Sequence, residues 1–447
     1  MSLLTRAWLG GVMLAAVLTV DLPGADAPIR FRCQSTNGNW SDWLGDGDST
    51  GQGSGGTIAF SPDNELLLRP LDDSTLVLWQ LTKKSELARL DHRGWLRFVR
   101  FSPDSRKLLV ALDQPGAKAG ESEIVLWDLE TLTIVRRLEE GRTCWDADFS
   151  RDGGELVTSS QSLHKDDPLE NKVAVWSMAT GEELARLQTQ KRGKEHRPNN
   201  ASLDFSPDGK WLLTSANDGA IIWDAADWHR VRSLPGSADA RLGRFSPDSR
   251  FVFAGCQKRT NSDPLGVRVW NVDTGKMVAA TTFDISKDER GDCGFALAPD
   301  GKSLVTTASI SIGSPKQHLR TIMKFWNVVS GQEMVLQSQT GKESYYFGRG
   351  ARFSPDGETL AMASWQPRPE IKFVDTKYWQ TQKSFDMTLP EDDQQPVVWW
   401  DVGGLRFSPD GRWFAATRIV QGFSGRELFL WQLETDGQPR ADSEVEK

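Results

Sequence analysis

Histidine, cysteine and paired carboxylates most often carry catalysis or hold metals, and here they show no recognised spacing. The five histidines, His92, His164, His196, His229 and His318, include no H-x-x-x-H pair. The chain also has no C-x-x-C motif and no phosphate-binding loop. We therefore predict a protein that is not an enzyme, with no catalytic residue, no metal site and no cofactor.

Residues 44–56 contain two motifs that imitate ligand-binding loops. Residues 46–51 open like an EF-hand calcium loop, but the glutamate that should close the loop is replaced by Thr57. Residues 51–56 fit G-x-G-x-x-G, yet they precede a strand, whereas a dinucleotide-binding motif opens a helix. Both motifs therefore indicate a flexible glycine-rich connector.

Most of the chain repeats one turn and the strands around it. The turn is complete in Phe205-Ser206-Pro207-Asp208-Gly209, and related copies begin at Phe60, Phe101, Phe149, Phe245, Leu297, Phe353 and Phe407. Proline presets φ, the serine and aspartate side chains cap the turn, and glycine takes the positive φ that follows. A short strand lies on each side of the turn, a third strand ends in an anchor residue, and a fourth follows a second turn. These anchors are Trp79, Trp127, Trp176, Trp223, Trp270, Trp326, Val374 and Trp431.

Four short antiparallel strands form a sheet that cannot bury its own faces, so the copies must pack against one another. Their spacing of 40–56 residues is typical of β-propellers. Over residues 56–433 the pattern resembles the WD40-repeat family, in the Ser-Pro-Asp-Gly-rich form of its bacterial members. Among the anchors, the Trp-Asp dipeptide survives only at Trp127 and Trp223, and only Asp91-His92 approximates the family's Gly-His. We therefore do not expect the family's His–Asp–Ser–Trp network to hold these blades, and interpret the seven anchor tryptophans as packing between them.

The repeats predict an all-β, eight-bladed β-propeller of four-stranded antiparallel blades, with seven blades as the alternative. After Trp431 the chain becomes polar, so the eighth blade lacks an outer strand, whereas residues 29–33 form a spare one. We expect this N-terminal strand to close the ring. The predicted organisation is a leader (1–27), a closing strand with its connector (28–55), the propeller (56–433) and a polar tail (434–447).

Residues 1–27 resemble a signal peptide. Arg6 precedes an apolar stretch over residues 7–20, which is shorter than the roughly 20 residues of a membrane-spanning helix. Residues 25–27 form an A-x-A cleavage site, although Pro28 after it is unfavourable. We expect export to the periplasm or the outside; an uncleaved leader that tethers the protein and a cytoplasmic location stay open. Export would permit a Cys256–Cys293 disulfide, with buried thiols as the alternative.

One charged position recurs immediately before the repeated phenylalanine, at one level of the central channel. Ring order makes Arg100 a neighbour of Asp148, and Asp204 a neighbour of Arg244, so we predict ion pairs between these blades. Arg352 and Arg406 have no acid at that level, which leaves an anion site in the channel as the alternative.

The remaining connections are long and differ between blades, and in a WD40-type propeller they share the face opposite the repeated turns. They are 112–122, 160–171, 256–265, 308–320 and 419–426 within blades, and 189–200, 284–293, 338–349 and 387–398 between blades. Variable loops on a uniform scaffold are typical of binding surfaces, and aromatic residues with arginine anchor interfaces. The candidate partner surface is Tyr345, Tyr346, Phe347, Arg349, Trp399, Trp400, Lys191 and Arg192. Solvated loops without a partner are the alternative for each segment.

We accordingly predict a monomeric scaffold that binds a protein or peptide partner through these loops. The net charge of −8 argues against nucleic acid, which requires a basic face. We expect the protein to be attached to a membrane only if the leader is uncleaved. The alternatives are an enzyme of the quinoprotein-like propeller type, and a carbohydrate- or cell-wall-binding module that uses Trp365, Trp399 or Trp400.

Overall fold

The computed structural model contains strands and turns only. It describes residues 29–34, 58–72, 74–113, 122–139, 142–161, 171–188, 202–216, 219–238, 240–256, 265–286, 289–312, 318–341, 351–364, 370–387, 399–421 and 425–433. Over these residues it has 32 strands, and none of the described segments forms a helix that could cross a membrane.

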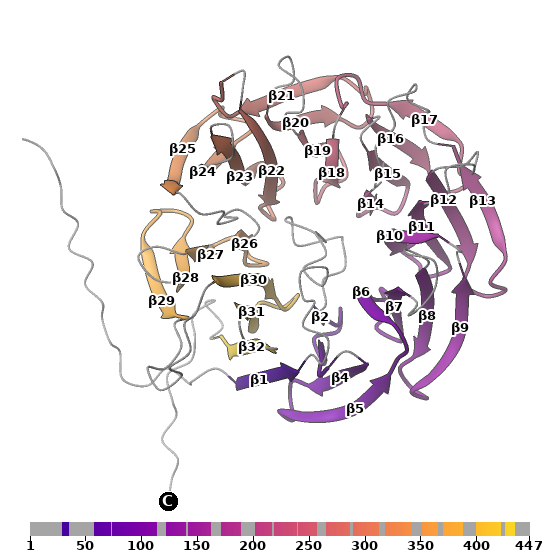
Figure 1. The fold of residues 1–447 in the computed structure, drawn as a ribbon. Helices are drawn as coiled ribbons and strands as arrows, with labels where there is room; N and C mark the ends of the chain where they lie inside the picture. Colours follow the sequence, from indigo (N-terminus) through magenta and orange to yellow (C-terminus); the bar gives the residue numbers. More distant parts are fainter. Residues whose placement is uncertain are drawn as a thin grey trace, which may run out of the picture.

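The strands form eight four-stranded antiparallel sheets arranged as blades in a ring (Figure 1). Blade 1 consists of β2 (Ala59–Phe60), β3 (Leu66–Pro70), β4 (Thr75–Gln80) and β5 (Ser85–Asp91), and blade 2 of β6 (Trp95–Phe101), β7 (Lys107–Asp113), β8 (Ser122–Asp128) and β9 (Thr133–Glu139). Blade 3 consists of β10 (Thr143–Phe149), β11 (Glu155–Gln161), β12 (Asn171–Ser177) and β13 (Glu183–Leu187), and blade 4 of β14 (Ser202–Phe205), β15 (Trp211–Ala216), β16 (Gly219–Asp224) and β17 (Arg230–Ser233).

The other four blades follow the same order from the channel outward. Blade 5 consists of β18 (Ala240–Phe245), β19 (Phe251–Cys256), β20 (Gly266–Asn271) and β21 (Met277–Thr282), and blade 6 of β22 (Arg290–Leu297), β23 (Ser303–Ile312), β24 (His318–Asn327) and β25 (Glu333–Gly341). Blade 7 consists of β26 (Ala351–Phe353), β27 (Thr359–Ser364), β28 (Glu370–Asp375) and β29 (Thr381–Asp386), and blade 8 of β30 (Trp399–Phe407), β31 (Trp413–Gln421), β32 (Gly425–Gln432) and β1 (Ile29–Gln34). The prediction of an all-β propeller with eight blades is confirmed.

The eighth blade combines the two ends of the propeller. Strand β1 pairs antiparallel with β32, from Ile29 opposite Leu430 to Gln34 opposite Gly425 (Figure 1). This pairing covers the edge that β32 would otherwise expose, because a strand from the start of the chain completes the last sheet. The predicted closure by an N-terminal strand is confirmed.

Blade 6 differs from its prediction in strand length. Residues 308–320 were expected to form a loop, but β23 and β24 pair as far as Ile312 opposite His318. Much of that segment is therefore a hairpin, because the alternating Thr, Ile and Leu residues continue the two strands.

The hydrophobic core lies between the blades. One cluster unites Leu68 and Leu78 of blade 1 with Val99, Val110 and Trp127 of blade 2. The other interfaces repeat this arrangement. Among the anchors, Trp79 and Trp176 are partly buried, and the buried ones are Trp127, Trp223, Trp270, Trp326, Val374 and Trp431. Each buried aromatic ring removes a large apolar area from water, which holds the neighbouring sheets together.

The repeated turn is built by its serine and aspartate side chains. The Ser206 hydroxyl donates to Asp208 (2.6 Å) and accepts the N–H of Trp211 (2.9 Å), while Asp208 accepts the N–H of Lys210 (3.2 Å). Where Ala298 replaces the serine, Asp300 accepts the N–H groups of both Lys302 and Ser303. The turn is therefore specified within about six residues.

Three turns have a side chain at the positive-φ position, where the others have glycine. These residues are Asn64 (φ 65°), Ser105 (φ 59°) and Ser249 (φ 61°). Ser105 accepts the N–H of Asp63 (3.1 Å), and Ser249 accepts that of Asp208 (3.0 Å). Asn64 accepts the N–H of Asp410 (2.9 Å) and so joins blade 1 to blade 8. The strained residue thus supplies a hydrogen bond between neighbouring blades.

Candidate functional site

Most of the predicted partner surface falls outside the described residues. This applies to Lys191, Arg192, Tyr345, Tyr346, Phe347 and Arg349. The backbone of Trp399 and Trp400 lies in β30, but their side chains, like Trp365, are outside the described part. The surface therefore stays a prediction.

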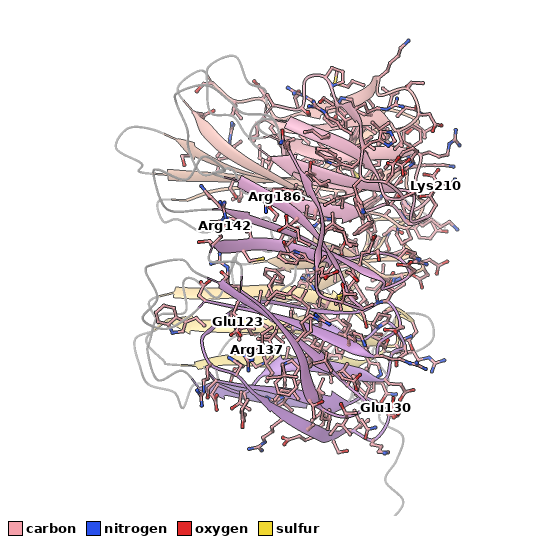
Figure 2. All side chains as sticks on the ribbon, turned by 90° about the vertical axis from the view of Figure 1, so that its right-hand side faces the viewer. Glu123, Glu130, Arg137, Arg142, Arg186 and Lys210 are labelled. Carbon is pink, nitrogen blue, oxygen red and sulfur yellow. The ribbon has the colours of Figure 1, made fainter. Side chains whose placement is uncertain are left out.

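The topology separates a uniform face from a variable one. Because the strands of each blade are antiparallel, the turns after the first and third strands share one face, and the remaining connections leave from the other. Figure 2 shows Lys210 and Glu130, which lie in the two kinds of turn, on one side of the ring and Arg142 toward the other. We call these the turn face and the loop face.

Charged side chains from four blades meet in the central channel. Arg100 pairs with Asp148 (3.2 Å) and also with Asp146 (2.8 Å), and Arg244 lies 3.9 Å from Asp204. The two predicted interblade pairs are confirmed, and Asp146 is an addition that sequence reasoning missed although it stands two residues before Asp148 on the same strand. Arg352 and Arg406 donate to the carbonyls of the residues before them.

Burial perturbs the channel carboxyls. It raises the pKa of Asp204 to about 7, against the opposing charge of Arg244 and the N–H of Phe245, which Asp204 accepts at 2.7 Å. Burial also raises the pKa of Asp146 and Asp148, which share the charge of Arg100. These carboxyls are engaged by arginines and backbone N–H groups, an arrangement that fixes the relative position of the blades.

Two anchor tryptophans retain half of the WD40 hydrogen-bond network. The indole N–H of Trp176 donates to Thr158 (3.0 Å), and that of Trp223 donates to Thr214 (3.0 Å). Trp270 instead donates to the carbonyl of Pro235 in the preceding blade (2.9 Å). These bonds contain neither the histidine nor the aspartate of the His–Asp–Ser–Trp network, so the expectation that the full network does not hold these blades stays a prediction.

Two further groups of side chains have residue types that could do chemistry. Asp224, Asp227 and His229 cluster at the turn after β16, where Asp224 accepts the N–H of Ala226 and Asp227 accepts a hydrogen bond from the ring of His229. This bond to Asp227 raises the pKa of His229. These bonds belong to the turn itself. Cys293 is buried, but the side chain of Cys256 is outside the described residues, so their predicted disulfide stays untested.

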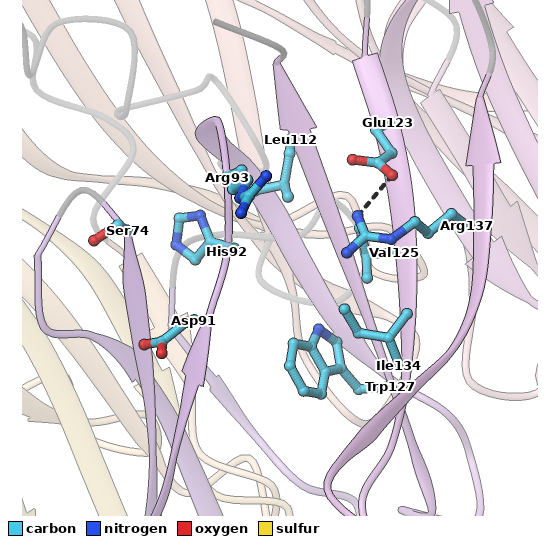
Figure 3. A pocket seen from close by; sticks show the side chains of 10 residues that line it. All are labelled: Ser74, Asp91, His92, Arg93, Leu112, Glu123, Val125, Trp127, Ile134 and Arg137. Carbon is cyan, nitrogen blue, oxygen red and sulfur yellow. Dashed lines mark hydrogen bonds and ion pairs between the residues drawn. The ribbon is translucent and has the colours of Figure 1, made fainter.

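A cleft of about 600 Å³ lies between blades 1 and 2 (Figure 3). Blade 2 supplies an apolar wall of Leu112, Val125, Trp127 and Ile134. A cavity of this volume, with an apolar wall and a few polar groups, is typical of ligand-binding sites.

Charged groups line the rest of this interblade cleft. Asp91, His92 and Arg93 come from the end of blade 1 and the connection after it. On blade 2, Glu123 is largely buried, with 9% of its side chain exposed, and pairs with Arg137 at 2.7 Å. Figure 3 shows His92 and Asp91 across the opening from Trp127, with the carboxylate of Asp91 directed away from Trp127. The cleft was not predicted from the sequence. There Trp127 was interpreted only as a packing anchor, and His92 only as part of an approximate Gly-His dipeptide.

Comparison with known proteins agrees with this architecture. The family model for the WD domain, G-beta repeat, matches residues 193–224. The serine-threonine kinase receptor-associated protein of Dictyostelium discoideum is 24% identical over 284 residues, which are 60% of this chain and 82% of that protein. The chain therefore contains a match to the WD40 repeat and is similar to WD-repeat proteins. The resemblance to bacterial members of that family stays a prediction.

Other relatives of this WD40 propeller match over less of their length. Human apoptotic protease-activating factor 1 is 24% identical over 55% of this chain and only 17% of its own length. Human transducin beta-like protein 2 is 33% identical over 26% of this chain and 27% of its own length. Among solved structures, dihydro-heme d1 dehydrogenase NirN superposes with a TM-score of 0.54 at 18% identity, covering 75% of this chain and 67% of that one. At that identity the likeness concerns the fold alone.

Proposed function

We propose that this WD40 propeller is a non-catalytic, monomeric scaffold that binds a protein or peptide partner on its loop face. The observation that carries the proposal is the contrast between the two faces. The repeated turns share one hydrogen-bond pattern, whereas the connection between the second and third strands varies from residues 217–218 in blade 4 to 162–170 in blade 3. Variation confined to one face of a rigid frame is how binding surfaces are built.

The relatives and the buried carboxyls support a binding role. One relative is named for its association with a serine-threonine kinase receptor, and others are WD-repeat proteins such as RACK1. Among the described residues, the channel carboxyls Asp146, Asp148 and Asp204 are held by arginines and backbone N–H groups. These contacts join neighbouring blades and so fix their relative position.

A paired capture experiment tests the loop face. The intact protein would be compared with a Tyr345→Ala, Tyr346→Ala, Phe347→Ala variant and with a turn-face control, Glu130→Ala with Lys210→Ala. Bound proteins would be cross-linked in an extract and quantified by mass spectrometry. We expect the triple variant to lose a partner that the control retains at wild-type level. Equal recovery by all three proteins, or loss from the control alone, would show that the surface is wrong.

We further propose that the scaffold is exported, on the strength of residues 1–27. N-terminal sequencing of the mature protein and fractionation of the producing cells test this. An N-terminus near residue 28 supports export. An intact leader in a membrane fraction supports a tethered protein, and an intact leader in the cytoplasmic fraction supports a cytoplasmic one.

A further inference from the structure

The interblade cleft exposes the basic member of its ion pair and covers the acidic one. Glu123 has 9% of its side chain exposed, whereas Arg137, which pairs with it at 2.7 Å, has 49% exposed. Among the described residues, Arg137 uses only one of its terminal nitrogens, Nη1, in a hydrogen bond. A ligand that enters the cleft therefore meets the guanidinium of this pair and not the carboxylate.

The other charged residues around the cleft agree with this. Arg93 is exposed, lines the opening, and has no hydrogen bond or ion pair within the described part of the chain. Asp91 directs its carboxylate away from Trp127 and accepts a bond from Thr75 of its own blade (3.3 Å). Its neighbour Leu90 is buried between blades 1 and 2, so Asp91 lies on the opposite face of β5. The charge presented to a ligand is therefore positive.

The groove between blades 5 and 6 shows how the same level is filled elsewhere in the ring. Lys324 stands there two residues before the anchor tryptophan, and its ammonium lies 3.6 Å from a carboxylate oxygen of Glu333. The ammonium also donates to the carbonyl of Thr282 (3.1 Å). That groove thus contains a cation together with its acid, both supplied by the chain.

Blade 2 replaces both members of that pair with apolar residues. Val125 stands two residues before Trp127, at the position of Lys324. Ile134 lies opposite Trp127, where blade 6 has Glu333 opposite its own anchor. The cleft between blades 1 and 2 therefore presents an open apolar wall where the other groove is filled by an ion pair.

The apolar wall and the basic groups lie at different ends of the cleft. Strand β8 runs from the loop face to the turn face, so Glu123 and its partner Arg137 lie toward the loop face and Trp127 toward the turn face. Arg93 belongs to the connection between blades 1 and 2, which leaves from the loop face. In Figure 3 the guanidinium groups of Arg93 and Arg137 accordingly lie above the ring of Trp127. A ligand with an apolar side chain and a carboxylate a few bonds apart matches both ends.

We propose that this cleft binds the C-terminus of a partner polypeptide that ends in a large apolar residue. The last side chain lies on Val125, Trp127 and Ile134, and the terminal carboxylate is held by Arg93 and Arg137 at the loop-face end. An aspartate or glutamate side chain carries its charge on a short stem and would leave most of the apolar wall uncovered. The inference rests on the proposed binding role of the loop face, to which it adds one contact and its chemistry.

Short peptides test the proposal. The probes are acetyl-Gly-Gly-Gly-Phe with a free C-terminal carboxylate, the same peptide as its C-terminal amide, acetyl-Gly-Gly-Gly-Gly with a free carboxylate, and acetyl-Gly-Gly-Glu-Gly as its amide. The reporter is the indole N–H resonance of Trp127, assigned by its loss in Trp127→Phe. We expect saturable shifts with the free-acid phenylalanine peptide, with a dissociation constant on the order of 1 mM for a single anchoring residue. The other three should bind at least about tenfold more weakly, because each lacks either the terminal charge or the apolar side chain.

Matched variants complete the experiment. Arg93→Gln should weaken binding of the free-acid phenylalanine peptide at least about tenfold, whereas Arg89→Gln, an exposed arginine of β5 that pairs with Glu86, should leave it unchanged. Ile134→Glu places an acid where blade 6 has one, and should weaken this binding more than Ile134→Gln, which has the same shape without the charge.

Four results would overturn the inference. They are equal binding of the phenylalanine amide, tighter binding of the glutamate peptide, unchanged binding to Arg93→Gln, and no saturable shift with the free-acid phenylalanine peptide. The capture experiment with the triple variant at residues 345–347 does not involve this cleft. Loss of a partner in that experiment, together with no peptide binding here, would sink this inference and leave the proposed function standing.

Discussion

Replacing Asp204 with asparagine should flatten the dependence of stability on pH. Burial raises the pKa of Asp204 to about 7, whereas in the unfolded chain it returns to its ordinary value of 3.8. Between these values the folded protein keeps a proton that the unfolded chain has lost. Protonation therefore stabilises the fold at low pH, and this stabilisation is lost as the pH rises toward 7.

The size of the effect follows from the separation of the two pKa values. At about 1.4 kcal/mol per unit, Asp204 alone should lower the free energy of unfolding by roughly 2–3 kcal/mol between pH 5 and pH 8. The asparagine of Asp204→Asn keeps an acceptor for the N–H of Phe245 but cannot titrate. Arg244 keeps its bonds to the carbonyls of Leu203 and Gly243, and the informative quantity is the difference in the free energy of unfolding between the two pH values.

The assay is urea unfolding at pH 5 and pH 8, followed by tryptophan fluorescence. Asp208→Asn in the same blade is the control. Burial alone would raise the pKa of Asp208, but the Ser206 hydroxyl and the Lys210 N–H hold it below its usual value. Its titration therefore lies below pH 5, and the control should keep the wild-type pH difference. An unchanged or larger difference in Asp204→Asn would refute the reasoning.

Two further changes test how the ring is held together. Ser105→Ala removes the hydrogen bond to Asp63 and keeps a strained positive φ, so we expect it to lower the free energy of urea unfolding by about 1–2 kcal/mol, whereas Ser105→Gly relieves the strain and should cost less. A larger cost for glycine than for alanine would contradict this account. Phe31→Pro and Arg32→Pro, tested separately, place proline at two consecutive positions of β1, only one of which directs its N–H toward β32. We expect that one to lower the free energy of unfolding by about 1–2 kcal/mol and to give faster proteolysis within blades 1 and 8. Unchanged proteolysis would mean that β1 does not secure the ring.

Much of the fold was predictable because the repeated turn is local. The hydrogen bonds of Ser206 and Asp208 stay within six residues, so eight copies indicate eight blades. The polar segment after Trp431 and the spare strand at 29–33 together predicted the closure. The pairs of Arg100 with Asp148 and of Asp204 with Arg244 also followed from sequence, because ring order makes residues at one repeat position neighbours.

The sequence by itself therefore determined the blade, its number and its closure. Only the tertiary structure decided how each interface between blades is filled. The bonds of Ser105 and Asn64 to neighbouring turns join residues 42 and 346 positions apart, and the cleft beside Val125 is lined by residues of two blades, so no local pattern records them. Whether a groove is open depends on what both of its blades place in it, as the contrast between the cleft beside Val125 and the groove that holds Lys324 shows. That comparison requires both blades in position, which is why the cleft emerged only from the folded ring.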